Sequence, residues 1–295
     1  MQALLQAIIS GILVGSSYSL VAMGMVILYR SSGIFNFAHG AVMLLGAFIF
    51  WTFISLAGLP LWACIIATII AMTLIGFFVE RFAMRPLLGQ PIIASLMMTL
   101  AVSVLFSGVY QVLWGHRGIV SYPQFMPMGH WVINGIVIGQ ANTWILFVTI
   151  LYFIFFKFYF KFTLSGKQMQ AICESHVIAQ SVGIDVKRML SRVWIIACLS
   201  AALAGILIGA SGSVGLYLHD FVFMVIPVII LGGLESLEGS FVAGFIVGVV
   251  EMVSANYIDP IIGGGFRQVA PYVLLLIVLL AKPYGLFGWE RIERI

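Results

Sequence analysis

The sequence has little charge. Only 8% of its 295 residues are Asp, Glu, Lys or Arg, whereas about a quarter of the residues in a soluble domain are charged. Hydrophobic residues make up 62% of the chain, and its longest polar stretch, residues 161–192, is too short for a separate catalytic domain. We therefore expect a single domain, residues 1–295, that is an all-α polytopic bundle of membrane helices.

The sequence also lacks the motifs of common enzyme classes. It contains no G-x-x-x-x-G-K-[ST] phosphate loop, no G-x-G-x-x-G after a strand, no H-E-x-x-H and no G-x-S-x-G. Its three cysteines, Cys64, Cys173 and Cys198, have no metal-like spacing and fall in apolar runs or in a loop expected in the cytoplasm. A catalytic site, a disulfide framework and a metal site are therefore not expected.

Two weaker signals do not change that conclusion. The histidines expected in outer loops lie far in sequence from any carboxylate cluster, apart from the neighbouring Asp220, and are interpreted as solvated: His116, His130 and His219. The net charge of +4 and the pI near 9.0 arise from basic residues dispersed among membrane loops rather than gathered on one soluble face. No nucleic-acid partner is expected.

Apolar segments recur along the chain at lengths that suit membrane crossing. The first is interpreted as a retained helix and not a signal peptide, because no Lys or Arg precedes Arg30. The candidate segments are residues 3–28, 36–56, 61–79, 92–114, 143–160, 193–212, 221–234, 240–258 and 269–282. Two of them, 221–234 and 269–282, have 14 residues each and are short for a crossing, so eight or nine transmembrane segments are predicted.

The distribution of basic residues predicts the orientation. If the N-terminus lies outside and all nine segments cross, twelve of the 14 Lys and Arg residues lie in inner segments, and only Arg117 and Arg267 lie in outer ones. The tryptophans at or beyond the predicted outer ends agree with this orientation: Trp51, Trp62, Trp114, Trp131 and Trp144. The C-terminus and the loop 161–192 are thus expected in the cytoplasm, and the loop 115–142 outside.

Small residues indicate how the helices pack. Three G-x-x-x-G pairs are typical of close helix contacts in lipid: Gly11 and Gly15, Gly205 and Gly209, and Gly244 and Gly248. Glu251 shares a helix face with the last pair and with Ala255, so it turns toward the packed side. An acid within a membrane helix costs roughly 3 kcal/mol on insertion scales. Glu251 is therefore either a pathway or gating residue or a hydrogen-bonded acid that fixes helix register.

The two polar loops carry further signals. In the outer loop, an Asn134-Gly135 turn between β-branched residues predicts a hairpin, which is either an external lid or docking element or an ordinary structured loop. In the inner loop, the pattern predicts a short helix from Glu174 to Val182, ended by Gly183. A helix of two turns is marginal alone. It therefore needs a partner surface, its own bundle or lipid headgroups, and its apolar anchors are Val177, Ile178 and Val182.

The stretch SSGIFNFAHG, residues 31–40, places polar residues at the start of an apolar segment. Asn36 is a good N-cap, and Gly33 loosens the chain before it. Counting from Asn36, the residues on one helical face are His39, Gly40, Met43 and Ala47, so this side is expected to point into the bundle and the phenylalanines largely elsewhere.

Four stretches together resemble one family. "GIFNFAHGAVMLLGAF" at 33, "SGKQMQAICESHVIAQSVGIDVKRMLSRVWIIACLSAALAGIL" at 165, "VIILGGLESLEGSFVAGFIVGVVE" at 228 and "KPYGLFG" at 282 are similar to the LivH-type permeases of branched-chain amino acid ABC importers. The loop pattern is shared more widely with ribose-type permeases. The resemblance implies a multi-pass permease subunit in a bacterial inner membrane, which carries branched-chain or similar hydrophobic amino acids.

The resemblance also implies partners and site residues. It implies a second related permease, as heterodimer or homodimer, two ATPase subunits that carry ATP and Mg, and an extracytoplasmic binding protein. The implied coupling helix consists of Glu174, Ser175, His176, Val177, Ile178, Ala179, Val182 and Gly183. The implied pathway candidates are Asn36, His39, Gly40 and Met43, with Glu251 as a further candidate from its position.

The resemblance leaves alternatives open. Members usually read close to GGLGSIPGA where this chain has GGLESLEGS. The alternatives for Glu235 and Glu238 are solvation, contact with a basic patch on the partner, or capping of the helix that begins near Gly239, and we expect the cap. Urea, amides and other small organic solutes are alternative substrates, since a binding protein largely selects the cargo. A secondary transporter or channel is the alternative from another class, but it would need charge pairs, and Glu251 stands nearly alone with His39 as the other candidate.

Overall fold

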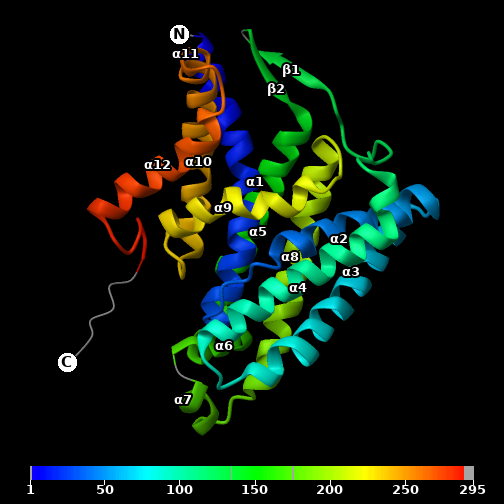
Figure 1. Ribbon diagram of the computed structural model, residues 1–295, viewed down its shortest axis with the longest axis vertical. Helices are drawn as coiled ribbons and strands as arrows, with labels where there is room; N and C mark the ends of the chain where they lie inside the picture. The colour runs from blue at the N-terminus through cyan, green and yellow to red at the C-terminus, as the bar shows by residue number, and fades with distance from the viewer. Residues whose placement is uncertain (1, 134, 175, 289–295) are drawn as a thin grey trace. The chain divides into compact units, whose positions relative to one another are not determined.

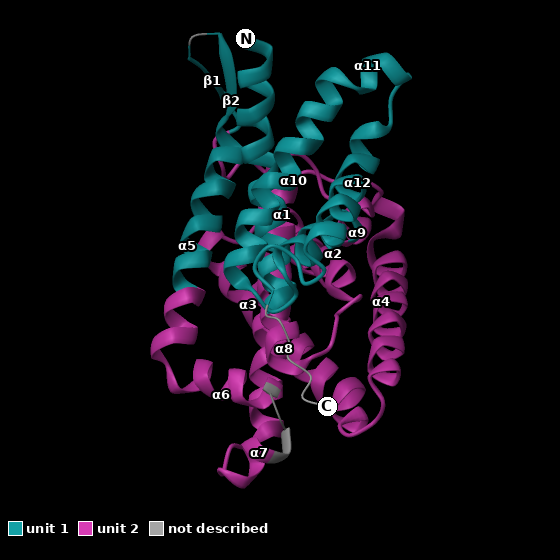
Figure 2. Cartoon of the chain, turned by 90° about the vertical axis from the view of Figure 1, so that its left-hand side faces the viewer, with its two compact units in different colours: residues 1–26, 128–155, 223–295 teal, residues 27–127, 156–222 magenta. Residues whose placement is uncertain are grey.

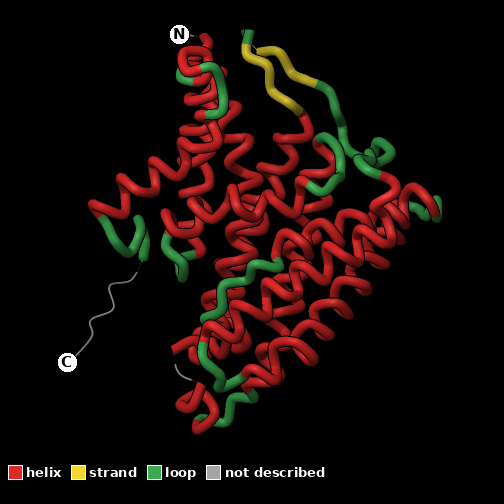
Figure 3. Tube along the Cα trace, in the orientation of Figure 1, coloured by secondary structure: helices red, strands yellow, loops and turns green. Residues whose placement is uncertain are grey.

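The chain is helical along almost its whole length (Figure 1; Figure 3). The structure, a computed structural model, describes residues 2–133, 135–174 and 176–288. Within these ranges, seven helices are long and apolar enough to cross a membrane. A lipid-embedded backbone must satisfy its hydrogen bonds internally, which is why apolar runs of this length become helices. The predicted all-α polytopic membrane bundle is confirmed.

The long helices have the following bounds, given with the π-helical and 3-10 segments that continue them. They are α1 (Gln2–Ser32), α2 (His39–Trp51) with η1 (Thr52–Leu56), α3 (Leu61–Phe78) with η2 (Val79–Met84) and η3 (Arg85–Leu87), α4 (Ile92–Trp114) with η4 (Gly115–Arg117), α5 (Gln140–Phe162), α8 (Val186–Ser211) and α10 (Leu237–Tyr257).

Two shorter helices decide how many times the chain crosses. Helices α9 (Tyr217–Gly232) and α12 (Phe266–Ala281) have 16 residues each, and each contains a proline. At 1.5 Å per residue they reach about 24 Å, short of the roughly 30 Å hydrocarbon core. The predicted eight or nine crossings, like the orientation of the termini, therefore stay predictions. The remaining helices are α6 (Leu164–Glu174), α7 (His176–Ser181) and α11 (Asp259–Ile262).

The expected hairpin is present in the loop 115–142. Strand β1 (His130–Ile133) pairs antiparallel with β2 (Ile136–Gly139), and Trp131 lies opposite Ile138. Gly135 has φ +80°, a left-handed conformation that glycine adopts without strain. Asn134, the other turn residue of the prediction, lies outside the described residues.

The chain divides into two compact units (Figure 2). Unit 1 contains residues 1–26, 128–155 and 223–295, and within it α10 packs against α12. Unit 2 contains residues 27–127 and 156–222, and within it α8 packs against α2 and α3 while α4 packs against α2. The single domain expected from the sequence stays a prediction.

Helix α2 is buried on every side. Of the residues from His39 to Trp51, only Ile49 is not fully buried. Phe48 and Phe50 are as buried as the polar and small residues of the helix. The expectation that the phenylalanines point away from the bundle is therefore wrong, because α2 is enclosed and has no lipid-facing side.

Candidate functional site

In unit 1, glycines bring α1 and α10 into backbone contact. A Cβ placed on Gly248 would lie 2.4 Å from the carbonyl oxygen of Gly11 and 2.5 Å from the Cα of Gly15, and one on Gly244 would clash with Ser19. The Ser19 hydroxyl donates a hydrogen bond to the Phe241 carbonyl at 2.8 Å. Two helices this close exclude any side chain at these positions.

The other predicted glycine pair lies in unit 2, on α8. A Cβ on Gly205 would lie 2.4 Å from the Met43 carbonyl oxygen, and one on Gly209 would lie 2.5 Å from a methyl group of Val214 and 2.9 Å from the ring of Tyr122. The Tyr122 hydroxyl donates to the Ala47 carbonyl at 3.0 Å, and burial raises the pKa of this phenol well above its usual value. These contacts hold the buried α2 against α8.

Glu251 follows Gly248 by three residues on α10 and is buried. The Tyr18 hydroxyl donates to its Oε2 at 2.5 Å, and Nη2 of Arg267 donates to its Oε1 at 3.1 Å. These residues line a small cavity of about 40 Å³ together with Met224, Gln268, Pro271 and Tyr272. The cavity therefore combines the carboxylate of Glu251, the guanidinium of Arg267 and the phenol of Tyr18 with mainly apolar walls.

The pairing of Glu251 with Arg267 was not predicted from the sequence. Arg267 was expected in an outer loop, but α12 begins at Phe266, so the arginine belongs to the first turn of that helix. Its backbone N–H donates to Oδ1 of Asp259 at 3.0 Å, which holds the start of α12 in place. The expectation that Glu251 stands nearly alone is wrong, because the helix begins earlier than the apolar run does.

The N-terminus of α2 differs from the prediction. The Oδ1 atom of Asn36 accepts a hydrogen bond from the N–H of Ala38 at 3.0 Å, and the N-cap of α2 is Ala38, which has no side-chain cap. Asn36 thus closes a local turn two residues ahead instead of capping the helix. The backbone N–H of Phe37 donates to Oγ1 of Thr99 on α4 at 3.4 Å. The polar stretch is therefore attached to α4 before the helix starts.

The first turns of α2 and α9 meet in unit 2. His39 is 1% exposed, and neither of its ring nitrogens has a hydrogen-bond partner in the part of the chain that the structure describes. A Cβ on Gly40 would lie 2.1 Å from the carbonyl oxygen of His219, so only glycine fits there. Among the described residues, His39 is thus a buried polar group without a hydrogen-bond partner. It lies at the start of α2, where that helix touches the start of α9.

His219 is a helical residue, although an outer loop was predicted. It lies in the first turn of α9, where its Nε2 is 3.1 Å from the Ser103 hydroxyl and its Nδ1 is 2.8 Å from Oδ1 of Asp220. The sequence does contain a signal for the partner of His219 on α4, which was not recognised. Hydroxyl residues recur every four positions on one face of that otherwise apolar helix: Ser95, Thr99, Ser103 and Ser107.

An apolar cavity of about 400 Å³ also lies in unit 2. Its walls come mainly from α2, α3 and α8, with Phe125 from the loop 115–142. Its one polar lining residue, Thr68, already donates its hydroxyl to the Cys64 carbonyl at 2.8 Å. The cavity can bury apolar groups, but it offers nothing that could hold the charged groups of a solute.

The predicted coupling segment is a short helix with a glycine stop. Helix α7 ends before Gly183, which has φ +85°. The N–H of Gly183 donates to the Gln180 carbonyl at 2.9 Å and that of Ile184 to the Ala179 carbonyl at 3.0 Å, the two bonds of a Schellman motif. Ser175 lies outside the described residues, as do the side chains of Glu174, His176 and Val177.

The side chains described in this segment divide into buried and exposed. Ala179 is 2% exposed and packs in a cluster with Ile172, Val186, Met189 and Leu190. Ile178 is 66% exposed and Val182 is 76% exposed. The helix is therefore anchored to α6 and α8 on one side and presents apolar side chains on the other.

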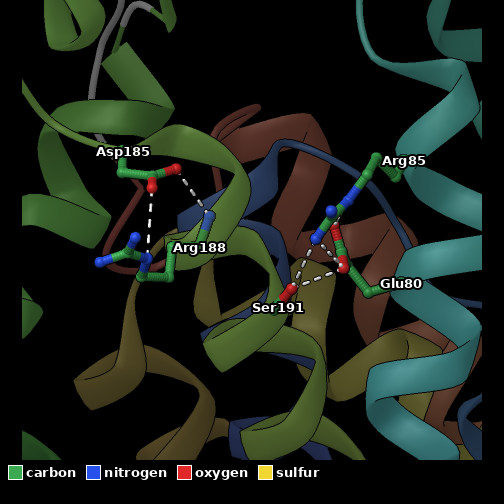
Figure 4. Close-up of polar contacts among 5 residues, drawn as sticks. All are labelled: Glu80, Arg85, Asp185, Arg188 and Ser191. Atoms are coloured by element: carbon green, nitrogen blue, oxygen red, sulfur yellow. Dashed lines mark hydrogen bonds and ion pairs between the residues drawn. The ribbon is translucent and has the colours of Figure 1, made fainter.

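A buried ion pair braces the start of α8 in unit 2 (Figure 4). Nε and Nη2 of Arg85 donate to the two carboxylate oxygens of Glu80 at 2.9 and 2.8 Å, and the Ser191 hydroxyl donates to Oε2 of Glu80 at 2.5 Å. Asp185 is the N-cap of α8 and accepts from the N–H of Arg188 at 3.0 Å. Sequence reasoning missed the pair because its members are five residues apart. The π-helical turn η2, which ends directly before Arg85, brings residues at this spacing together, whereas an α-helix does not.

The acids of the unusual GGLESLEGS stretch do not make the cap. Helix α10 begins at Leu237, and its N-cap is Ser236, whose hydroxyl accepts from the N–H of Gly239 at 2.9 Å. Glu238 lies in the first helical turn, where negative charge is favourable. The serine between the two acids is thus the capping residue. Among the described residues, no group of three or more His, Cys, Asp or Glu is placed to hold a metal ion.

Comparison with known proteins gives one consistent result. Residues 7–281 match the protein family described as "Branched-chain amino acid transport system / permease component". The chain is 27% identical to the high-affinity branched-chain amino acid transport system permease protein LivH of Salmonella typhimurium, over 99% of this chain and 97% of that protein. It is 28% identical to the corresponding protein BraD of Pseudomonas aeruginosa, over 99% of this chain and 98% of that one.

More distant proteins are also similar. The probable branched-chain amino acid transport permease protein LivH of Methanocaldococcus jannaschii is 24% identical over 94% of this chain and 90% of that protein. The solved structure of PsaBC from Streptococcus pneumoniae in complex with Fab aligns with a TM-score of 0.48 and 15% identity, over 97% of this chain and 92% of that one.

Proposed function

This chain belongs to the family of branched-chain amino acid transport permease components, and from that premise we propose that it forms the translocation pathway of an ATP-binding cassette importer. The proposed cargo is a branched-chain or similar hydrophobic amino acid, as the names of its relatives suggest. Urea or amide cargo and an ATP-independent mechanism are less favoured, since no relative named here carries such a description.

The observation that carries the proposal is the helix α7. It is anchored through Ala179 to the membrane helices and exposes Ile178 and Val182 in a loop with no lipid-spanning role. An ATPase subunit that binds ATP and Mg would bury these two side chains, and its movement would reach α8 directly through the shared cluster. Two such ATPases, a second permease chain, an extracytoplasmic binding protein and a bacterial inner membrane complete the proposed importer.

Charging the exposed face of α7 tests this proposal. Val182→Asp is expected to weaken the association with the ATPase subunit at least about tenfold, because a carboxylate buried at an apolar interface has no partner. Ile178→Asp is expected to act in the same way, and both variants should insert normally since the side chains are exposed. The measurement is co-purification of the ATPase with the permease from detergent-solubilised membranes.

The matched control is Leu164→Asp, an equally apolar-to-acidic change at a residue of α6 that is 79% exposed. It should retain the ATPase. If Val182→Asp and Ile178→Asp also retain it at the wild-type level, the docking role of α7 is wrong.

The start of α2 is proposed to line the pathway, with Asn36, His39, Gly40 and Met43. A buried polar group without a partner destabilises the folded state by about 1–3 kcal/mol. Replacing His39 with leucine, of similar volume, is therefore expected to raise the free energy of unfolding by about 1 kcal/mol or more and to lower amino acid uptake about tenfold. Thermal unfolding and uptake by proteoliposomes measure the two effects.

Leu44→Met provides the control, because it changes a fully buried side chain of the same helix without adding or removing a polar group. It should leave uptake unchanged. If the His39→Leu protein is more stable and transports at the wild-type rate, His39 does not line the pathway and only packs in the bundle.

A further inference from the structure

Among the described residues, two carboxylate–guanidinium pairs with a buried carboxylate differ in how completely their hydrogen-bonding groups are satisfied. Glu80 and Arg85 share two parallel N–H···O bonds, and Ser191 adds a third group, while the Arg85 side chain is only 21% exposed. Glu251 and Arg267 share a single hydrogen bond, and the Arg267 side chain is 48% exposed. The first pair is thus more fully hydrogen-bonded and less exposed than the second.

The second pair leaves N–H donors of the Arg267 guanidinium available. A guanidinium carries five N–H groups in a planar fork that suits a carboxylate. Within the described residues, the side chain of Arg267 uses one of these groups, for the 3.1 Å bond to Oε1 of Glu251. Glu251 itself is almost enclosed, with its side chain 6% exposed and its other oxygen held by Tyr18. The carboxylate of Glu251 is thus held in place, whereas the guanidinium of Arg267 can move.

We propose that Glu251 and Arg267 form a head-group site for zwitterionic α-amino acids, which opens when the cargo replaces their mutual contact. The cargo carboxylate takes the guanidinium fork of Arg267, and the cargo ammonium takes the carboxylate of Glu251. This inference rests on the proposed importer function and names the chemical class of its cargo.

The size of the cavity supports an exchange of partners. Its volume of about 40 Å³ has room for only a few water molecules, so an amino acid does not fit while Glu251 and Arg267 are in contact. The walls beside the charges are apolar or aromatic, from Met224, Pro271 and Tyr272. Once Arg267 has swung away, an aliphatic side chain would meet these walls while its head group meets the charges.

The exchange also explains why the site would select a zwitterion. Separating this pair leaves the enclosed carboxylate of Glu251 without its counter-charge, which is unfavourable in surroundings of low dielectric constant. A zwitterion supplies both replacement partners at once, so no charge is left unpaired. Urea and neutral amides supply no formal charge, and they would not compensate for opening the pair.

The test uses the complete importer in proteoliposomes, with its ATPase and its binding protein saturated with leucine. Three variants remove one or both charges: Glu251→Gln, which keeps the side-chain size, Arg267→Gln, which shortens the side chain, and the double variant. Each is expected to reduce leucine uptake at least about tenfold, while ATP hydrolysis stimulated by the loaded binding protein stays within about twofold of wild type. Arg117→Gln, which removes an arginine of the outer loop, is the matched control and should transport normally.

The double variant separates recognition from structure. If the pair only fixes the helices, two neutral amides that hydrogen-bond to each other should restore uptake to the wild-type level, and this result would overturn the inference. Should the neutral variants fail to assemble, Arg267→Lys keeps a cation beside Glu251 but loses the fork, and it is expected to raise the KM for the loaded binding protein or lower kcat at least about threefold. Wild-type kinetics from that variant would also overturn the inference.

Failure of the proposed function would look different. In that case the wild-type complex itself would show no ATP-dependent uptake. A wild type that transports, together with a neutral double variant that also transports, would leave the importer function in place and remove only the head-group site.

Discussion

Replacing Gly248 with leucine is expected to destabilise the protein strongly. The added Cβ would lie within 2.5 Å of the backbone of Gly11 and Gly15, where no flexible side chain can move aside. Helices α1 and α10 would have to separate, which would also break the hydrogen bond between Tyr18 and Glu251. We expect a loss of at least about 3 kcal/mol, at the upper end of what overpacking produces.

Gly108→Leu is the matched control for this prediction. Gly108 lies within α4, and a Cβ there has no atom within 4 Å. The control should fold normally and gain about 0.5–1 kcal/mol from the better helix propensity of leucine. Size-exclusion chromatography and thermal unfolding of the two solubilised proteins make the comparison. A Gly248→Leu protein that elutes and melts like wild type would show that α1 and α10 do not cross at these glycines.

The second large effect is expected at the buried ion pair of unit 2. Glu80→Ala removes the acceptor of both Arg85 bonds and of the Ser191 hydroxyl, and Arg85 is then left partly buried without its counter-charge. Losing one partner of such a pair costs about 3–5 kcal/mol, and the partial exposure of Arg85 places the expected loss near the lower limit. The melting temperature in detergent measures it.

Glu238→Ala is the control, because Glu238 is an exposed acid in the first turn of α10. Its loss should cost no more than about 1 kcal/mol. If Glu80→Ala is as mild as this control, the pair does not brace α8.

A double-variant cycle between Glu80→Ala and Ser191→Ala should give a coupling free energy of about 1 kcal/mol or more, since the two side chains share a hydrogen bond.

Sequence patterns predicted the features that depend on one helix at a time. The apolar runs predicted the long helices, and the glycine after Val182 predicted where α7 ends, because a left-handed residue is a local requirement. The hairpin followed in the same way from a turn between β-branched residues. Each of these signals is contained in a few neighbouring residues.

The features that were missed depend on local departures from regular helices or on distant partners. The π-helical turn η2 changes which residues face each other, so Glu80 and Arg85 were not paired in advance. Asn36 accepts from the near N–H of Ala38, and the N-cap of α2 is Ala38, two residues later than expected. The partner of Glu251 is 16 residues away on another helix, and the spacing of one helix cannot indicate it.

Uptake of radiolabelled leucine by proteoliposomes tests the central claim most directly. The proteoliposomes contain the permease pair with or without the ATPase subunits, and the loaded binding protein and ATP are supplied on opposite sides of the membrane. We predict accumulation of leucine only with the ATPase present and ATP hydrolysed, and none with an ATPase that cannot hydrolyse ATP. Accumulation at the same rate in proteoliposomes without any ATPase would contradict the account, because the chain would then be an ATP-independent transporter.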